Sequence, residues 1–445
     1  MSVAIVGGGC SGLLVALHLK RNGLAGPVTI VEPRPNLGGG LAYSTSFDQH
    51  LLNVPAGKMS AFSREPGHFL DWLRTRHRPD AVFNTFAPRM YFGEYLREIF
   101  RESGQCDHIQ AEATALEDGC LKLSNGTALP AKKIVLALGN PDSSAAPAMR
   151  KGLEDRWHLS PWLDGALRVR YPGERILIVG TGPTAVDSAL ALLGQKNRAS
   201  VYMISRRGFL PQVHNLQIAA NPLPALRHSG NIRLLCRELR VHIKQATQNG
   251  IDWRATIDAL RPVSNEIWQE FSLADRRTFL RHIRPYWEPH RSRMPPETSA
   301  QINKYQAQGS LQILAGHLEE VSALKAHIRL KLRLRQGGET TLEADRIISC
   351  TGTHEDYTKT PRRLVRSLLA AGLARGNDAG IGFSTGPNGA LLDKEMNPSP
   401  FLFTLGTPRR GDLIETTAVP EIRQQAEELA AHLAGTILRP EAMDR

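Results

Sequence analysis

Two glycine-rich motifs, each placed between a short apolar strand and an amphipathic helix, predict an α/β fold with two Rossmann-like dinucleotide-binding domains. A long stretch with helical patterning, at about 211–310, interrupts the second unit and predicts a helical insertion. The length of 445 residues agrees with this division, because it holds about three domains of roughly 150 residues. We expect residues 1–155 to form the first part of one domain and residues 156–352 to form the second domain.

The first motif begins only a few residues into the chain. The apolar run VAIV, typical of a strand buried on both faces, leads into GGGCSG, so Gly7, Gly9 and Gly12 satisfy GxGxxG. An amphipathic helix follows, and the next strand, VTIVE, ends in Glu32. Gly7 permits the tight turn, Gly9 lets the backbone approach a pyrophosphate, and Gly12 lets helix and strand pack. Glu32 stands where a ribose acceptor belongs, and this unit is therefore predicted to bind a dinucleotide.

The second motif lies in RILIVGTGPTAVDSALALL, again after a buried strand. Its GxGxxA positions are Gly180, Gly182 and Ala185. The next strand ends in Ser205, Arg206 and Arg207 instead of an acid. A hydroxyl and two guanidinium groups suit a 2′-phosphate, which predicts NADPH in place of NADH. The alternative is an ordinary solvated arginine pair at a strand end.

The composition excludes several other classes of protein. Lys and Arg number 55 against 43 Asp and Glu, a formal charge of +12, but the cations are spread along the chain and do not alternate with aromatic residues. We therefore expect no nucleic-acid partner, since anionic small ligands explain the excess as well. The five cysteines show no metal-ligand spacing, so no metal site is predicted. No apolar run approaches the roughly 20 residues of a membrane span, and a cytoplasmic location is expected.

Two further apolar strands, KKIVLALGN and DRIISCTGT, end in small residues plus glycine. With the paired glycine motifs, they resemble the two-dinucleotide-binding-domain flavoproteins, in which FAD occupies the first unit and NADPH the second. The resemblance implies that residues 353–445 return to the FAD domain. It places Gly411 and Asp412 near the flavin ribityl chain, and Thr416 and Thr417 close to the start of the final helix. A positive helix end there would stabilise negative charge on a reduced flavin.

Disulfide reductases of this architecture need a redox-active cysteine pair, which this sequence lacks. The electrons then leave the flavin most simply to oxygen. The segment 36–75, which contains Gly40 among the expected cofactor-binding residues, resembles flavin-containing and N-hydroxylating monooxygenases. By that match Asn53 would hold NADP and the oxygen adduct, a C4a-(hydro)peroxyflavin. The alternative role of Asn53 is an Asx turn before Pro55.

The motifs GGGLAYS, LLNVPA, VGTGPTAVDSAL, ISRRG and ETTAVPEIR extend the likeness over most of the chain. They resemble a bacterial group of FAD/NAD(P)-binding proteins related to class B flavin monooxygenases. This resemblance implies a single-component monooxygenase that oxygenates a small molecule at nitrogen, sulfur or a carbonyl, with molecular oxygen as co-substrate. An NADPH:acceptor oxidoreductase, which passes electrons to a quinone or a protein, is the first alternative. A noncatalytic flavin-binding sensor or scaffold is the second.

The expected insertion contains a short cluster of aromatic and charged residues between Pro285 and Pro295. Trp287, His290 and Arg291 are its candidate substrate residues, since such a cluster could bind an acidic substrate or the phosphates of NADPH. A structural ion-pair network is the alternative. We expect the insertion to roof the cleft between the two domains, where small-molecule pockets tend to form.

Overall fold

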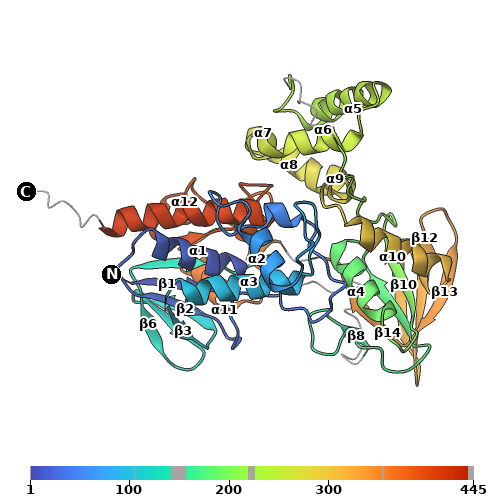
Figure 1. The fold of residues 1–445 in the computed structure, drawn as a ribbon, viewed down its shortest axis with the longest axis horizontal. Coiled ribbons are helices and arrows are strands. Elements are labelled where there is room, and N and C mark those ends of the chain that lie inside the picture. The colour runs from blue at the N-terminus through green and yellow to red at the C-terminus, as the bar shows by residue number, and fades with distance from the viewer. Residues whose placement is uncertain (1, 105, 142–156, 219–225, 353–354, 439–445) are drawn as a thin grey trace, which may run out of the picture.

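The computed structural model describes residues 2–104, 106–141, 157–218, 226–352 and 355–438. Two sheet-containing domains lie side by side, and a bundle of helices stands above their junction (Figure 1). The predicted α/β class with two dinucleotide-binding domains and a helical insertion is confirmed. The expected boundaries at 155/156 and 352/353 involve residues that lie outside the described ranges.

The first domain is built on a mainly parallel sheet with the order β15-β16-β7-β1-β2-β3. Its strands are β1 (Val3–Val6), β2 (Val28–Val31), β3 (Asp107–Ile109), β7 (Lys133–Leu136), β15 (Ala390–Leu392) and β16 (Pro398–Thr404). The central strand β1 pairs in parallel with both β2 and β7, and it is buried throughout. Because β16 adds to β7 in the same sheet, the C-terminal part of the chain completes the first domain.

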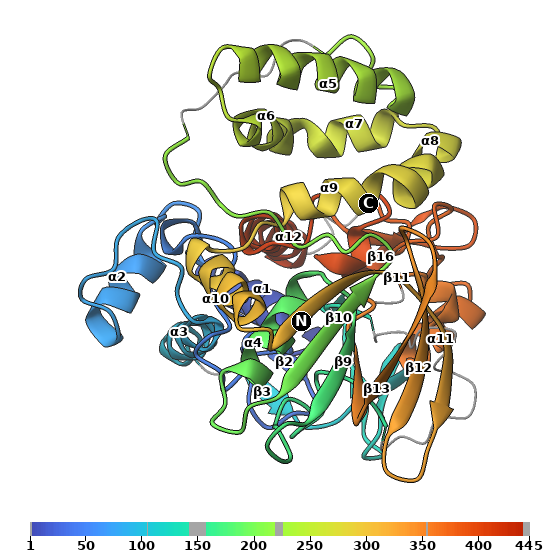
Figure 2. The same cartoon turned by 90° about the vertical axis from the view of Figure 1, so that its right-hand side faces the viewer.

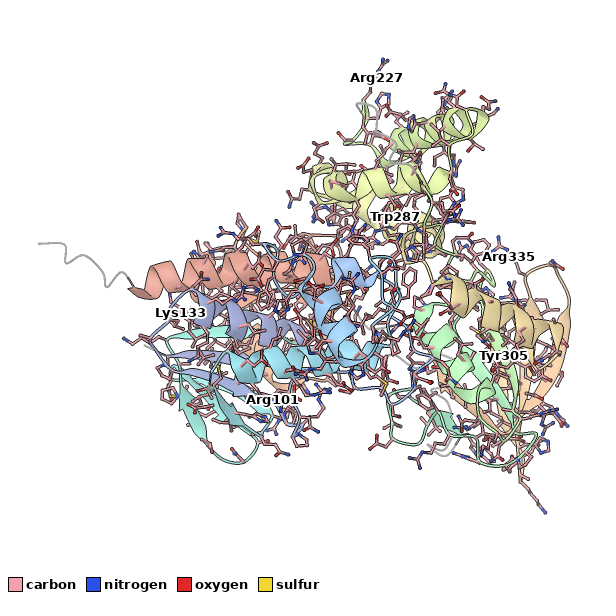
Figure 3. The ribbon with its side chains drawn as sticks, viewed as in Figure 1. Arg101, Lys133, Arg227, Trp287, Tyr305 and Arg335 are labelled. Atoms are coloured by element: carbon pink, nitrogen blue, oxygen red, sulfur yellow. The ribbon has the colours of Figure 1, made fainter. Side chains whose placement is uncertain are left out.

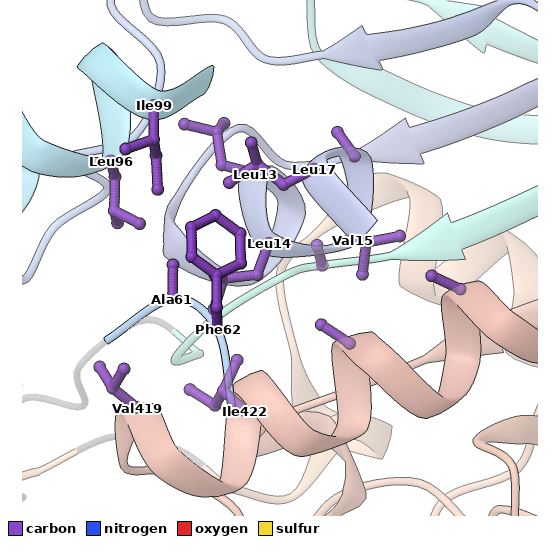
Figure 4. Packing of buried hydrophobic residues seen from close by; sticks show 14 of the residues in the cluster. Leu13, Leu14, Val15, Leu17, Ala61, Phe62, Leu96, Ile99, Val419 and Ile422 are labelled. Carbon is purple, nitrogen blue, oxygen red and sulfur yellow. The ribbon is translucent and has the colours of Figure 1, made fainter. Parts of the chain in front are cut away.

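Helices cover one face of this sheet, and a small antiparallel sheet with one helix covers the other. The helices of the first face are α1 (Cys10–Arg21), α2 (His68–Arg76), α3 (Arg89–Glu102) and α12 (Val419–Leu438). The second face carries β4 (Ala113–Glu117), β5 (Cys120–Leu123), β6 (Ala128–Pro130) and α11 (Arg363–Ala370). In the core, Phe62 lies between α1, which contributes Leu14, and α12, which contributes Val419 and Ile422 (Figure 4). This packing fixes the final helix beside the first glycine motif.

The second domain has a sheet with the order β13-β12-β11-β10-β9-β14-β8. Its strands are β8 (His158–Leu159), β9 (Arg175–Val179), β10 (Ser200–Ser205), β11 (Leu311–Ala323), β12 (Ile328–Leu334), β13 (Glu339–Ala344) and β14 (Arg346–Ser349). The strands β14, β9, β10 and β11 are parallel, and α4 (Pro183–Leu193) connects β9 to β10. A buried ion pair stabilises this domain, because Arg346 and Glu174 are both fully buried and their nearest atoms lie 2.8 Å apart.

The helical bundle is inserted between β10 and β11 and lies above the rest of the chain (Figure 2). Its helices are α5 (Ile232–Gln248), α6 (Trp253–Leu260), α7 (Ser264–Glu270), α8 (Leu273–Thr278), the π-helical turn η4 (Phe279–Ile283) and α9 (Arg284–Arg291). Helix α10 (Pro296–Ala307) instead packs against α4 and β11 of the second sheet. An amphipathic helix has the same periodicity in a bundle and against a sheet. The pattern at 211–310 therefore could not show that α10 belongs to the second sheet and the other helices to the bundle.

None of the helices within the described ranges is long and apolar enough to cross a membrane. Within the same ranges, no group of three or more His, Cys, Asp or Glu side chains is arranged to hold a metal ion.

Candidate functional site

Close backbone packing explains the glycines of the first motif. Gly7 has φ +110°, and a Cβ there would clash with the carbonyl oxygen of Ala137, just beyond β7. A Cβ at Gly12 would clash in turn with the carbonyl oxygen of Gly7. A Cβ at Gly40, where φ is +52°, would lie 3.3 Å from the Cα of Gly9. The loop therefore presents bare backbone at the N-terminus of α1, which is the geometry that suits a pyrophosphate.

Glu32 lies at the end of β2 and is almost completely buried. Its Oε2 accepts a hydrogen bond of 2.9 Å from the backbone N–H of Gly8, and Arg34 Nε donates to its Oε1 at 2.8 Å. Burial alone would raise the pKa of Glu32, but these hydrogen bonds outweigh it and hold the pKa below its ordinary value. An ionised carboxylate with lone pairs beside the glycine loop fits a ribose hydroxyl as its ligand.

The first glycine of the second motif is constrained in the same way as Gly7. Gly180 has φ +131°, and a Cβ there would clash with the carbonyl oxygen of Cys350, just beyond β14. Gly182 caps α4 and has open space where a Cβ would stand, whereas Ala185 is fully buried in the helix. The open space lies in front of the helix N-terminus, where a phosphate would be stabilised by free N–H groups and the helix dipole.

The three residues after β10 differ in their surroundings. Ser205 Oγ accepts from the backbone N–H of Gly208 at 2.9 Å and lies 2.8 Å from the Thr181 hydroxyl, so it organises the turn. Arg206 is exposed to solvent. The guanidinium carbon of Arg207 lies 4.9 Å from the ring centre of Tyr286 in α9, and its Nε is buried with no hydrogen-bond partner in the described chain. A buried donor without a partner fits a phosphate oxygen.

A third arginine lies in the same place, and the sequence motifs did not predict it. Arg335 follows β12, and its backbone N–H donates to the carbonyl of Ala315 at 2.8 Å. Ala315 in turn is adjacent to Gly208, and both Arg207 and Arg335 lower the pKa of Tyr286 through hydrogen bonds and charge. Arg335 is labelled on the second domain in Figure 3. It stands 128 residues beyond Arg207 in the chain, so no local pattern could have indicated it.

The C-terminal loop 411–417 contains the residues expected near the flavin. Asp412 Oδ2 accepts from the backbone N–H of Thr385 at 2.6 Å, and its Oδ1 accepts from Asn377 at 3.0 Å. Burial raises the pKa of Asp412 above its ordinary value despite these hydrogen bonds. Gly411 is buried, and its carbonyl accepts from the indole N–H of Trp268 at 2.8 Å.

The two threonines of this loop have different roles. Thr416 is fully buried, and its hydroxyl donates to the carbonyl of Gly406 at 3.0 Å. Thr417 is exposed just before α12, beside the free N–H groups at the start of that helix. Thr416 therefore shapes the loop, whereas Thr417 is available to a ligand.

Asn53 lies at the surface of the segment between β2 and α2. Its backbone carbonyl is 3.0 Å from Nε2 of His214, which belongs to the connection leading into the insertion. Burial lowers the pKa of His214 to about 4, so the ring is neutral at pH 7 and donates its Nε2–H to Asn53. The Asn53 amide makes no hydrogen bond to the residues that the structure describes, so it is free to meet a ligand.

Asp187 of α4 joins the first domain to the second glycine motif. Its carboxylate lies 2.8 Å from Arg89, and its backbone carbonyl lies 3.0 Å from Nε2 of His50. His50 is buried and is held at its other nitrogen by Thr45 at 2.8 Å. The segment that carries Asn53 is thereby fastened to α4, the helix that Gly182 caps.

The three candidate substrate residues of the insertion separate into two groups. Arg291 forms two hydrogen bonds of 2.6 Å with Glu415, which favours the ion-pair alternative for this residue. Arg261 is likewise bonded to Glu421 at 2.8 Å, so ion pairs fasten the insertion to the C-terminal segment. Trp287 and His290 instead line a cavity within the insertion. The assignment of all three to a substrate stays a prediction.

The cysteines provide no redox centre among the described residues. Burial raises the pKa of Cys10 and Cys350 to about 12, so both thiols are protonated at neutral pH. Because a thiol must ionise to exchange electrons with a flavin, these two are unreactive structural groups.

Two glycine loops on mainly parallel sheets, with the C-terminal helix α12 packed against α1, give the chain the fold of a protein with two dinucleotide-binding domains. The comparisons agree, because residues 4–141 match the FAD-NAD(P)-binding family model. The chain also resembles the ornithine hydroxylase PvdA from Pseudomonas aeruginosa, at 16% identity and a TM-score of 0.66 over 98% of this chain and 99% of that one. The cadaverine monooxygenase DfoA from Erwinia amylovora is similar at 14% identity, with a TM-score of 0.67 over 98% and 95% of the two chains.

One curated relative is a ferredoxin–NADP reductase. The chain is 27% identical to the ferredoxin–NADP reductase of Thermus thermophilus over 239 residues, which are 52% of this chain and 60% of the relative. The chain therefore spans about three fifths of that relative. At these identities the structural likenesses establish the fold, and the predicted fold class and the FAD/NAD(P) assignment are confirmed.

Proposed function

We propose that this chain is an FAD- and NADPH-dependent oxidoreductase that acts as a single-component monooxygenase on a small molecule. The observation that carries the proposal is the pair of glycine loops, one beside the buried carboxylate of Glu32 and the other beside Arg207, whose buried Nε has no partner among the described residues. The likeness in fold to the ornithine hydroxylase PvdA and the cadaverine monooxygenase DfoA supports oxygen as the electron acceptor.

The chain offers a consistent set of groups for each cofactor. In the first domain, the Gly7–Gly12 loop would receive the pyrophosphate of FAD, Glu32 a ribose hydroxyl, and Thr417 with the start of α12 the flavin edge. In the second domain, the loop at Gly182 would receive the pyrophosphate of NADPH, and Arg207 its 2′-phosphate. The bound flavin and nicotinamide would supply the hydride transfer and the oxygen chemistry.

Asn53 would orient NADP and the reacting oxygen through its amide, which can both donate and accept. The neutral His214 supports the backbone of Asn53, and Asp187 holds the same segment against the second domain. These contacts would keep the Asn53 amide in one position while the insertion excludes water above it.

The reductase alternative has its own support in the likeness to a ferredoxin–NADP reductase. If the chain is a reductase, the same cofactors transfer electrons to a quinone or a protein, and Asn53 does not control the reaction with oxygen. The two functions differ in whether oxygen is consumed in step with NADPH.

The experiment measures NADPH oxidation, oxygen consumption and peroxide release together, with a library of small molecules. We expect Asn53→Ala to leave FAD bound and flavin reduction by NADPH largely intact, while the peroxide released per NADPH rises. Asn125→Ala, at an exposed position of the β5–β6 turn, is the matched control and should change nothing. If the wild-type protein reduces quinones or dyes rapidly and no compound makes oxygen uptake efficient, the monooxygenase proposal is wrong and the reductase takes its place.

A further inference from the structure

The helical insertion contains a partly open cavity of about 410 Å³. Ligand pockets in proteins commonly have volumes of about 300–1,000 Å³ and form between the helices of bundles. The walls come from α5, α6, α7, α9 and the turn η4, and they include Trp253, Trp268, Trp287, Leu239 and Ile243. The volume of the cavity falls within the range for small-molecule pockets.

The floor of the cavity reaches the loop expected to lie beside the flavin. Ile414 of that loop lines the cavity, and the wall residue Trp268 donates its indole N–H to the carbonyl of Gly411. Trp287 stands at the base of the insertion in Figure 3, where the bundle meets the two domains. A molecule bound in the cavity would therefore touch the segment that carries Asp412 and Thr417.

The charges at the cavity have one sign. Arg240 and His290 are the ionisable nitrogen bases among its described lining residues, and no Asp or Glu is among them. An ammonium group would lose its hydration there without gaining a carboxylate partner, which is unfavourable. A carboxylate head would instead meet Arg240, an exposed residue of the lining, with its apolar body against the indole and aliphatic walls.

We propose that the insertion is a binding site for an elongated hydrophobic molecule with an anionic head, and that it rejects aliphatic diamines. The site does not depend on the proposed monooxygenase function, since binding requires only the bundle and Ile414. Decanoate is a suitable probe because it combines an apolar chain with a carboxylate.

The test titrates decanoate into the full-length protein and follows tryptophan fluorescence, with equilibrium dialysis as the direct measure of binding. Three of the six tryptophans in the chain line the cavity, so occupancy should alter the emission. We expect saturable binding of decanoate, weaker binding of decanol, and none of 1,5-diaminopentane.

Two matched pairs of variants locate the site on α5. Ile243→Glu places a carboxylate in the cavity, one turn from Arg240, and should raise the decanoate dissociation constant at least about tenfold because it repels the ligand carboxylate and competes for Arg240. Val241→Glu makes the same change on the same helix, where Val241 is 51% exposed, and should have an effect under about twofold. Arg240→Gln should weaken decanoate more than decanol, and Arg237→Gln, outside the lining, should affect neither.

Absence of saturable decanoate binding, or equal weakening by both glutamate variants, would overturn the proposal, as would competition by 1,5-diaminopentane. These outcomes concern binding alone. Failure of the protein to couple oxygen uptake to NADPH would remove the proposed monooxygenase function while leaving the ligand site intact.

Discussion

Replacement of Arg207 by glutamine tests the proposed discrimination between NADPH and NADH. Arg207 is held over the Tyr286 ring at 4.9 Å, and its Nε is buried without a partner among the described residues. Glutamine retains polarity and most of the length of the side chain but removes the charge. The variant therefore removes the phosphate contact while largely preserving the packing.

The expected magnitude follows from the burial of this donor. A charge-assisted hydrogen bond contributes about 1.5–3 kcal/mol, which corresponds to about a 10- to 150-fold increase in the NADPH dissociation constant. Affinity for NADH should change by less than about twofold, because NADH has no phosphate to lose. Arg206 is exposed, so Arg206→Gln should cost about 0.2–1 kcal/mol, or about 1.4- to fivefold.

Anaerobic stopped-flow measurement of flavin reduction at increasing NADPH and NADH concentrations gives both dissociation constants. The control is Arg329→Gln, an arginine on β12 whose side chain is 55% exposed. If Arg207→Gln weakens NADPH and NADH equally, or no more than the control does, Arg207 does not contact the 2′-phosphate.

Three further predictions concern the scaffold. Gly12→Val should abolish retention of FAD, because the side chain would clash with the Gly7 carbonyl. Flavin absorbance after gel filtration measures this, and a full flavin content would contradict the prediction. Arg346→Met removes the closest charged partner of the buried Glu174, which keeps a hydrogen bond from the backbone N–H of Arg170, and should lower the free energy of unfolding by about 3–5 kcal/mol in urea titrations. The pKa of His214 is about 4 in the folded protein, which is below its ordinary value. As the pH falls, the unfolded chain therefore binds a proton at this residue before the folded protein does. The contribution of His214 to stability is present above about pH 6.5 and is lost between about pH 6.5 and 4. His214→Gln should therefore reduce this acid destabilisation by about 2 kcal/mol, and an unchanged pH profile would refute it.

The sequence was most informative where function depends on contiguous residues. The glycine loops and Glu32 could be predicted because strand, turn, helix and acceptor follow one another within about thirty residues in a βαβ unit. Arg335 and the Arg346–Glu174 pair could not, because each joins elements far apart in the chain. The cavity of the insertion escaped prediction for a related reason. Helical periodicity indicates which residues face inward, but it does not indicate whether facing helices close completely around them.

The glycines of both loops differ in how they can evolve. At Gly7, Gly12 and Gly180 the obstructing atom is a backbone carbonyl oxygen, which every amino acid carries, so no second substitution can make room for a side chain. At Gly8 the nearest obstruction is the side chain of Leu37, which a smaller residue would relieve. Under selection for flavin retention, damage at Gly8 would be repaired by changes at Leu37, whereas damage at the other three positions would be repaired only by reversion.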